Sequence, residues 1–173
     1  VDFETKIFYK TNVAERLVEA LGRPGYRCSP IALGTNTDPY QPAEKSLKIT
    51  RTILTTLLEW RHPVSIVTKG ALILRDLDLL QALASEGLAS VMLSITTLNT
   101  GLKTTLEPRA AGPAARLKCV RELAAAGVED ISAGLGRQRL LQQAAGRGIA
   151  GIDQPRHRLE ITARLLVGPG FRG

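Results

Sequence analysis

The chain has 173 residues, of which 44% are hydrophobic and 23% are charged. This length suits about one domain, and this composition excludes an intrinsically disordered protein. No apolar run approaches the roughly 18 residues that a membrane-spanning helix needs, so we expect no contact with a membrane. The formal charge of +7 is spread along the chain, which we interpret as a contribution to solubility rather than as a nucleic-acid-binding patch.

The first residues, VDFE, include no initiating methionine and no secretory signal. We therefore expect that residue 1 is not the natural start of the protein. The two cysteines, Cys28 and Cys119, are too far apart to form a disulfide framework or a metal site by themselves, and we expect both to be core thiols. These features together predict a cytoplasmic location.

The apolar pattern predicts short strands that alternate with helices. In chain order, we expect a strand at 5–10, a helix at 12–21, a strand at 29–34, a helix at 43–61, a strand at 64–68, a helix at 76–86, a strand within 88–96 and a helix from Pro113 that Gly127 closes. Strand–loop–helix units that repeat about every 30 residues are typical of parallel strands with helical crossovers. The fold class is therefore α/β, with about four βα units.

The regular alternation is expected to stop after Val128, where a further strand is due. Residues 129–173 hold seven Arg, no Lys and eight of the 16 Gly, and they show little periodicity. We therefore divide the chain into a body at 1–128 and an irregular, Arg- and Gly-rich tail at 129–173. An out-of-frame translation of a GC-rich gene tends to give such a composition, so we hypothesise a frameshift or a fusion near residue 128.

Polar side chains follow three of the predicted strands, at the end where parallel α/β folds bind ligands. They are Asn36 and Asp38 after the second strand, Lys69 after the third, and Ser94 and Thr96 at the end of the fourth. Such a rim suits a ligand with a carboxylate, a ribose and an amino group. Lys69 would pair with an anion, Asp38 with an ammonium, and the hydroxyls with the sugar. The simpler interpretation is ordinary loop polarity and strand capping.

Other chemistry is not indicated by the residues. The sequence has no Ser–His–Asp pattern, no Gly-rich phosphate loop and no metal-ligand spacing, so no catalytic or metal-binding residue is predicted. The segment Leu106-Glu-Pro-Arg109 adds two opposite charges, for which a surface salt bridge is the simple interpretation. The residues alone thus predict part of an α/β barrel with a polar ligand rim.

Several motifs occur in an order that resembles a known enzyme family. They are GTNTDPYQPAE at 34–44, VTKG at 67–70, LRDLDL at 74–79, SIT at 94–96 and LEPR at 106–109. Together they resemble the radical S-adenosylmethionine (SAM) proteins of the spore photoproduct lyase-like, or "DNA repair photolyase", branch. The resemblance covers about residues 2–128 and identifies the body as a partial radical-SAM (β/α) barrel.

The resemblance implies an enzyme in which a [4Fe–4S] cluster and an electron donor reductively cleave SAM to start radical chemistry, with nucleic acid as a potential substrate. Lys69 and Ser94 would hold the carboxylate and ribose region of SAM, with Thr96 beside them, and Asn36 and Asp38 would lie near its amino group. The cluster of the family requires three cysteines in one loop, which would fall before residue 1, so the chain is expected to be an inactive fragment. The alternative is a non-catalytic nucleotide- or nucleic-acid-binding α/β module.

Overall fold

The computed structural model describes residues 9–128 and 130–133, with side chains for residues 9–128. The elements in chain order are α1 (Val13–Leu21), β1 (Ile31–Leu33), α2 (Glu44–Leu47), α3 (Ile49–Glu59), β2 (Val64–Thr68), the 3-10 helix η1 (Ala71–Asp76), α4 (Leu77–Ser85), β3 (Ala89–Leu93), α5 (Thr100–Leu106), α6 (Pro113–Ala125) and β4 (Asp130–Ala133). The expected α/β class is confirmed by this mixture of helices with a parallel sheet.

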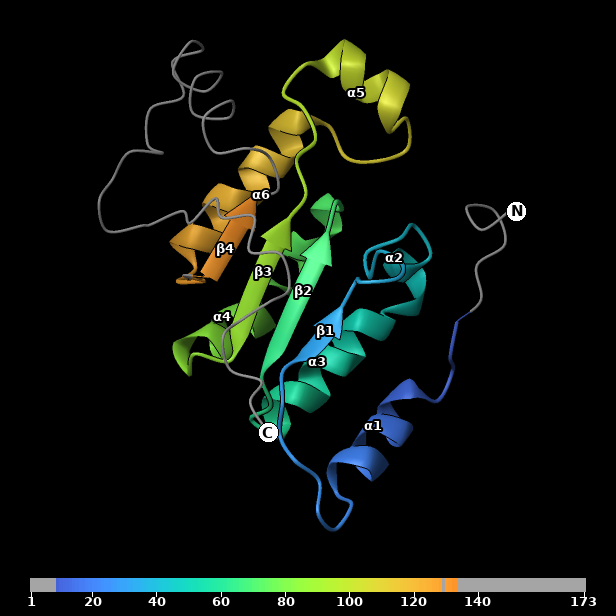
Figure 1. Cartoon of the computed structure of the whole chain (residues 1–173), viewed down its shortest axis with the longest axis vertical. Helices are drawn as coiled ribbons and strands as arrows, with labels where there is room; N and C mark the ends of the chain where they lie inside the picture. The colour runs from blue at the N-terminus through green and yellow to red at the C-terminus, as the bar shows by residue number, and fades with distance from the viewer. Residues whose placement is uncertain (1–8, 129, 134–173) are drawn as a thin grey trace, which may run out of the picture.

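The described strands form one sheet in the order β1-β2-β3-β4, and every neighbouring pair is parallel. Between the strands, the chain crosses over through α3, α4 and α6, which lie on one side of the sheet (Figure 1). Right-handed crossovers place successive helices on the same face when the strands follow one another in chain order. The carboxyl ends of all four strands therefore meet at one edge, which is the upper edge in Figure 1.

The core lies between the sheet and these helices. In β2 the side chains alternate between buried and half-buried, and Val64, Ile66 and Thr68 are the buried ones. This period of two places them on the face that the helices cover. Fully buried leucines complete the core from the helices, namely Leu54, Leu57, Leu80, Leu83 and Leu123. Each such leucine contributes roughly 1.5–3 kcal/mol by leaving water.

The helix predicted at 43–61 is two helices, because the chain turns at Lys48. Lys48 has a left-handed backbone conformation with φ of 51°, which ends α2 and precedes α3. The buried Glu44 carboxylate accepts a hydrogen bond from the Thr50 backbone N–H at 3.0 Å. A carboxylate at the first turn of α3 satisfies a free N–H group and favours the positive end of the helix dipole, which offsets the strain at Lys48.

Two further expectations need correction. The segment at 100–106, expected to be a loop, forms α5, whose N-cap Asn99 accepts a hydrogen bond from the Leu102 N–H. The alternation also does not stop at Val128, since β4 pairs with β3 in parallel from Ser90↔Asp130 to Leu93↔Ala133. Its four residues, DISA, carry too few apolar side chains for a recognisable strand, and backbone pairing with β3 supplies the hydrogen bonds instead.

Other predictions fall at the ends of the chain. The helix expected at 12–21 is confirmed as α1. Most of the strand expected at 5–10 lies outside the described residues, and Tyr9 and Lys10 are not in a strand. The tail expected to be irregular lies outside them from residue 134 onward.

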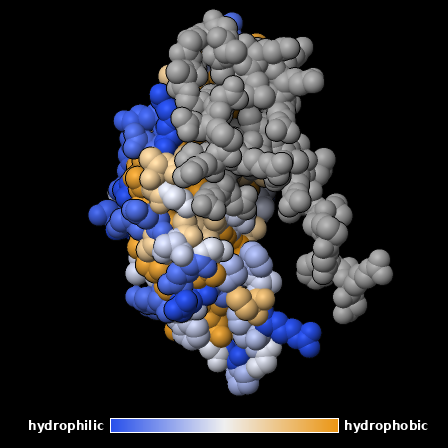
Figure 2. All heavy atoms as spheres, turned by 90° about the vertical axis from the view of Figure 1, so that its left-hand side faces the viewer, coloured by the Kyte–Doolittle hydropathy of each residue, from blue (hydrophilic) through white to orange (hydrophobic). Residues whose placement is uncertain are grey.

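The outer surface of α6 is polar. In α6, Lys118, Arg121 and Glu122 are exposed, whereas Cys119 and Leu123 are buried. Figure 2 shows the side of the molecule that carries α4 and α6, with hydrophilic side chains along one edge and hydrophobic ones beside them. Within the described ranges, no helix combines the length and the apolar character that crossing a bilayer requires.

Candidate ligand site at the carboxyl ends of the strands

The loop after β1 is tied to the end of β2 by Asp38. One carboxylate oxygen of Asp38 accepts hydrogen bonds from the Tyr40 N–H at 2.9 Å and the Thr68 hydroxyl at 2.7 Å. The other oxygen accepts the Lys69 N–H at 2.8 Å. Asp38 therefore fixes the loop and the backbone of Lys69 relative to each other, and both of its oxygens already have partners from this chain.

Gly34 allows this loop to pass close to β2. Its φ is +94°, and a Cβ atom added there would lie 1.9 Å from the carbonyl oxygen of Val67. A side chain at this position would have to push the two strand ends apart, because backbone atoms cannot approach so closely. The first residue of the GTNTD motif thus brings the end of β1 against the end of β2.

The ammonium of Lys69 makes an ion pair with Glu107, which follows α5. The distance from Lys69 Nζ to Glu107 Oε1 is 2.6 Å, and the two side chains are 45% and 12% exposed. Glu107 is therefore mostly buried, in contrast to the surface salt bridge expected for the LEPR segment. The pair joins the residue directly after β2 to the residue directly after α5.

The second carboxylate oxygen of Glu107 is held from two sides. It accepts hydrogen bonds from the Thr96 hydroxyl and from Arg116 Nη2, each at 2.8 Å. Arg116, from α6, is only 2% exposed, and its other nitrogens donate to the backbone carbonyls of Ser94 at 2.6 Å and Ala111 at 2.9 Å. Arg116 thus connects α6, the loop after β3 and Glu107 as one rigid unit.

These contacts determine the charge of Glu107. Burial alone would raise its pKa, but hydrogen bonds from Lys69, Arg116 and Thr96 outweigh burial and hold the pKa at about 2. Glu107 is therefore ionised throughout the physiological pH range. The rim then presents an ammonium and a carboxylate next to each other, with the hydroxyl of Thr96 beside them.

The predicted residues are brought together to different degrees. Lys69 and Thr96 share Glu107, and Ser94 enters the network through its carbonyl group. Asp38 is joined to Lys69 through the backbone, and Asn36 is exposed in the loop after β1. These positions do not test whether any of the five side chains binds a ligand, so those roles stay predictions.

Glu107 and Arg116 were not predicted as site residues. A signal for Arg116 exists in the sequence, since it lies at helical spacing with the buried Val120 and Leu123 on the apolar face of α6. An arginine on such a face needs a buried acceptor, because an unpaired charge in the core is very unfavourable. Glu107 carries the opposite charge nine residues earlier.

A second charged cluster explains other motif residues. Arg75 donates to the Asp76 carboxylate at 2.7 and 2.8 Å and to the Glu44 carboxylate at 2.8 Å. Arg51 donates to Asp76 at 3.0 Å and makes two hydrogen bonds with Asp78. Hydrogen bonding to Arg51 lowers the pKa of Asp78. The LRDLDL segment therefore joins η1 and α4 to α2 and α3, and its charges are structural.

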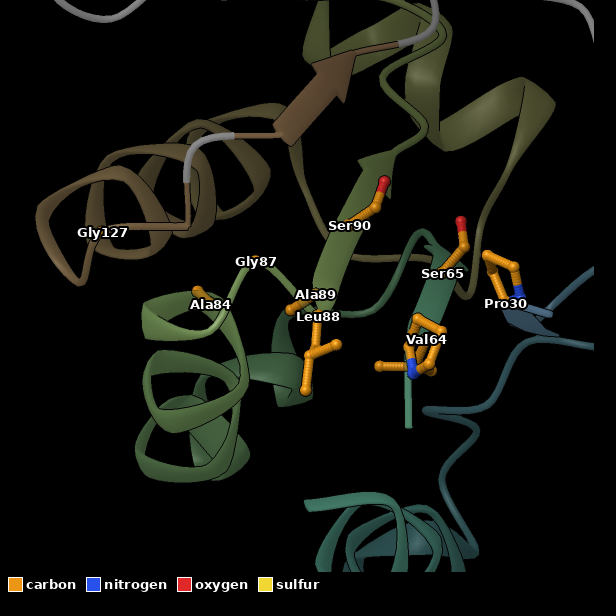
Figure 3. A pocket seen from close by; sticks show the side chains of 10 residues that line it. Pro30, Val64, Ser65, Ala84, Gly87, Leu88, Ala89, Ser90 and Gly127 are labelled. Atoms are coloured by element: carbon orange, nitrogen blue, oxygen red, sulfur yellow. The ribbon is translucent and has the colours of Figure 1, made fainter. Parts of the chain in front are cut away.

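A cavity lies at the opposite, amino-terminal end of β2 and β3. Its volume is about 500 Å³, and residues such as Pro30, Val64, Leu88 and Ala89 line it. Figure 3 shows Ser65 and Ser90 projecting from neighbouring strands at this cavity, where they are register partners. Binding sites in parallel α/β folds occur at the other end of the strands, so we do not assign this cavity to the ligand rim.

The cysteines do not form a metal centre in the described part of the chain. Cys28 is exposed, in contrast to the core position expected for it, because it lies in the extended segment before β1. Cys119 is buried in α6, and burial raises the pKa of its thiol. Within residues 9–128, no three His, Cys, Asp or Glu side chains gather as metal ligands would.

Comparison with known proteins identifies relatives but no function. The chain is 40% identical over 128 residues to uncharacterized proteins of Mycobacterium tuberculosis and Mycobacterium bovis, which is 74% of this chain and 38% of each relative. It is 33% identical over 100 residues to an uncharacterized protein of Methanocaldococcus jannaschii, which is 58% of this chain and 37% of that protein. No family model and no solved structure matches.

Proposed function

We propose that this chain is part of a radical-SAM enzyme and that the rim formed by Lys69, Thr96 and Glu107 binds SAM. The observation that carries the proposal is the Lys69–Glu107 ion pair at the carboxyl ends of parallel strands. SAM carries a carboxylate, an ammonium and a ribose, and the rim offers an ammonium, a carboxylate and a hydroxyl to match them. The five motifs that resemble the family include these three residues.

The arrangement of the sheet supports a partial (β/α) barrel. Its strands follow one another in chain order and its crossover helices lie on one side, as in the units of such a barrel. A doubly wound sheet reverses its strand order partway and carries helices on both faces. Within residues 9–133 the chain supplies three βα units and the strand of a fourth.

The two cofactors of the family fit this chain differently. For SAM, Lys69 would hold the carboxylate, and the hydroxyl groups near Ser94 and Thr96 would face the ribose. When bound, SAM supplies radical chemistry after one-electron reduction of its sulfonium. The cluster that delivers the electron does not fit, because the sequence has two cysteines and they lie on separate elements. The chain spans 38% of the length of the mycobacterial relatives.

Calorimetric titration of the chain with SAM tests the proposal. The wild-type chain is expected to bind SAM, and Lys69→Met is expected to weaken binding by roughly 10–150-fold, because a hydrogen bond to a charged group contributes about 1.5–3 kcal/mol. Lys45→Met, at an exposed lysine of α2, is the matched control and should leave the affinity unchanged. Absence of SAM binding, or equal affinities for all three proteins, would contradict the proposal.

The same samples examine the alternative of a non-catalytic module. Duplex DNA that binds with strong salt dependence, in a chain that does not bind SAM, would favour a nucleic-acid-binding function. The titration does not test the proposed nucleic-acid substrate or the proposed electron donor. Activity measurements on a longer protein would test both.

A further inference from the structure

Lys103, in α5, is the one buried lysine in the part of the chain that the structure describes. It is 9% exposed, although α5 lies at the surface, beyond the carboxyl ends of the strands (Figure 1). Lysine is almost never buried without a charged partner, because its ammonium is strongly hydrated in water. Lys69 has such a partner in Glu107. The remaining described lysines are exposed, namely Lys10, Lys45, Lys48 and Lys118.

The contacts of Lys103 leave most of its ammonium without a partner. Its Nζ donates to the Pro108 carbonyl at 3.2 Å, and this is its one hydrogen bond to a described residue. An ammonium has three donors, so two remain. No carboxylate of the described residues forms an ion pair with Lys103, and both oxygens of Glu107, next to Pro108, have other donors.

Capping of α5 is the simple interpretation of this lysine. A lysine in the last turn of a helix can donate to a carbonyl there and interacts favourably with the helix dipole. Such a lysine is ordinarily exposed, so water satisfies its other donors, whereas burial of Lys103 removes much of that water. Capping therefore accounts for one donor of three. The hydrogen bond is only part-buried and Pro108 is exposed, so a small ion from solvent can reach the other two.

Positive charge is in excess around residues 107 and 108. Lys69 and Arg116 contact the Glu107 carboxylate, and Lys103 contacts the next carbonyl along the chain, so three cations face one anion. Arg116 and Lys103 are both buried, where an uncompensated charge is unfavourable. SAM would not correct this excess, because its sulfonium and ammonium outnumber its one carboxylate. The turn after α5 therefore favours an additional anion.

We propose that Lys103 and the turn after α5 form a binding site for a phosphate group, either free phosphate or a phosphate monoester. Such a group carries a charge of about −1.5 to −2 at neutral pH, which matches the surplus of two positive charges better than a carboxylate does. The two remaining donors of Lys103 suit phosphate oxygens, which accept strong hydrogen bonds from charged donors. The site lies beside the rim and does not depend on SAM. A phosphorylated second ligand would bind there.

Calorimetric titration with potassium phosphate, at constant ionic strength in a chloride buffer without SAM, tests this inference. The wild-type chain is expected to bind phosphate. Lys103→Met keeps much of the length and volume and is expected to weaken binding at least tenfold, because charge-assisted hydrogen bonds are lost. Lys118→Met, at an exposed position of α6, is the matched control and should leave the affinity unchanged. Lys69→Met, which removes the ammonium of the rim, should weaken binding less than Lys103→Met does.

The possible results decide between a phosphate site and its alternatives. Absence of phosphate binding, or equal affinities of the wild-type chain and Lys103→Met, overturns the inference. Equal weakening by Lys69→Met and Lys103→Met also overturns it, because phosphate would then occupy the rim. Acetate that binds as tightly as phosphate overturns the assignment to phosphate.

Two further measurements complete the test. Methyl phosphate that binds as tightly as phosphate supports a monoester site, whereas binding of inorganic phosphate alone supports a site for the free ion. If Lys103→Met fails to fold, phosphate binding that survives in Lys69→Met supports the inference, and its loss there overturns it. Since these titrations contain no SAM, their failure leaves the proposed function standing.

Discussion

Replacement of Arg75 by methionine should destabilise the fold strongly. The guanidinium of Arg75 makes two hydrogen bonds to the fully buried Asp76 carboxylate, one to the Glu44 carboxylate and one to the Glu44 carbonyl. Methionine keeps much of the length and volume but provides no donor. The carboxylates of Glu44 and Asp76, whose side chains are 6% and 0% exposed, would then each lose their main positively charged partner.

The expected loss in the free energy of unfolding is about 3 kcal/mol. Removal of one partner from a buried ion pair costs roughly 3–5 kcal/mol, because a buried charge is left uncompensated. The lower end applies here, since Glu44 keeps the Thr50 N–H, Asp76 keeps Arg51, and the Arg75 side chain is 19% exposed. For a chain of this size, each kcal/mol lowers the melting temperature by roughly 2–4 °C.

Urea denaturation followed by circular dichroism measures this loss at neutral pH. Arg16→Met is the matched control, because Arg16 pairs with Glu19 on the surface of α1, where the side chains are 70% and 51% exposed. An exposed pair three residues apart contributes about 0.2–0.5 kcal/mol. If the two variants lost equal stability, the conclusion that the buried charges of the LRDLDL segment stabilise the fold would be wrong.

Three further predictions concern the rim and the cofactor. Gly34→Ala should cost at least about 2 kcal/mol because of its φ and the Val67 carbonyl, whereas Gly25→Ala, with φ of +79° and open space around it, should cost only about 1 kcal/mol in the same urea assay. The pKa of Glu107 in the fold is about 2, below its ordinary value of 4.5, so ionisation of Glu107 stabilises the folded state by up to about 3 kcal/mol. This stabilisation is present above pH 5 and is lost as the pH falls toward 2. The wild-type chain should therefore exceed Glu107→Gln in stability at pH 7 and approach it at pH 3, and a constant difference would contradict this sign. Anaerobic reconstitution of the chain with iron and sulfide should yield no [4Fe–4S] cluster, because two cysteines cannot supply its ligands; stoichiometric iron with a cluster absorption band would be the contrary result.

The core of the sheet could be predicted from local pattern. Short apolar runs such as 64–68 are sufficient for buried parallel strands, and the glycines at 87 and 127 mark helix ends with positive φ. The break at Lys48 could not be predicted in this way. It depends on contacts of Glu44 with Thr50 and Arg75, which only the folded arrangement brings together.

The position of the candidate site was predictable from the sequence, but the contacts within it were not. Parallel strands bring their carboxyl ends to one edge, so Lys69 and Thr96 could be expected near each other. Sequence alone does not show that Glu107 joins them, because its burial depends on Arg116 from another helix. It also does not show that the Asp38 carboxylate accepts hydrogen bonds from the backbone, since this requires the close approach of the loop after β1 to β2 that Gly34 permits.

The two cysteines give this chain a built-in chemical reporter. Cys28 is open to reagents in the folded state, whereas Cys119 lies under the packed face of α6 and contacts the Ala71 carbonyl. A thiol reagent should therefore modify Cys28 at once and Cys119 only when α6 separates from η1. The rate of the second reaction then measures how often the body opens, and a ligand that binds the rim should slow it, with no engineered label required.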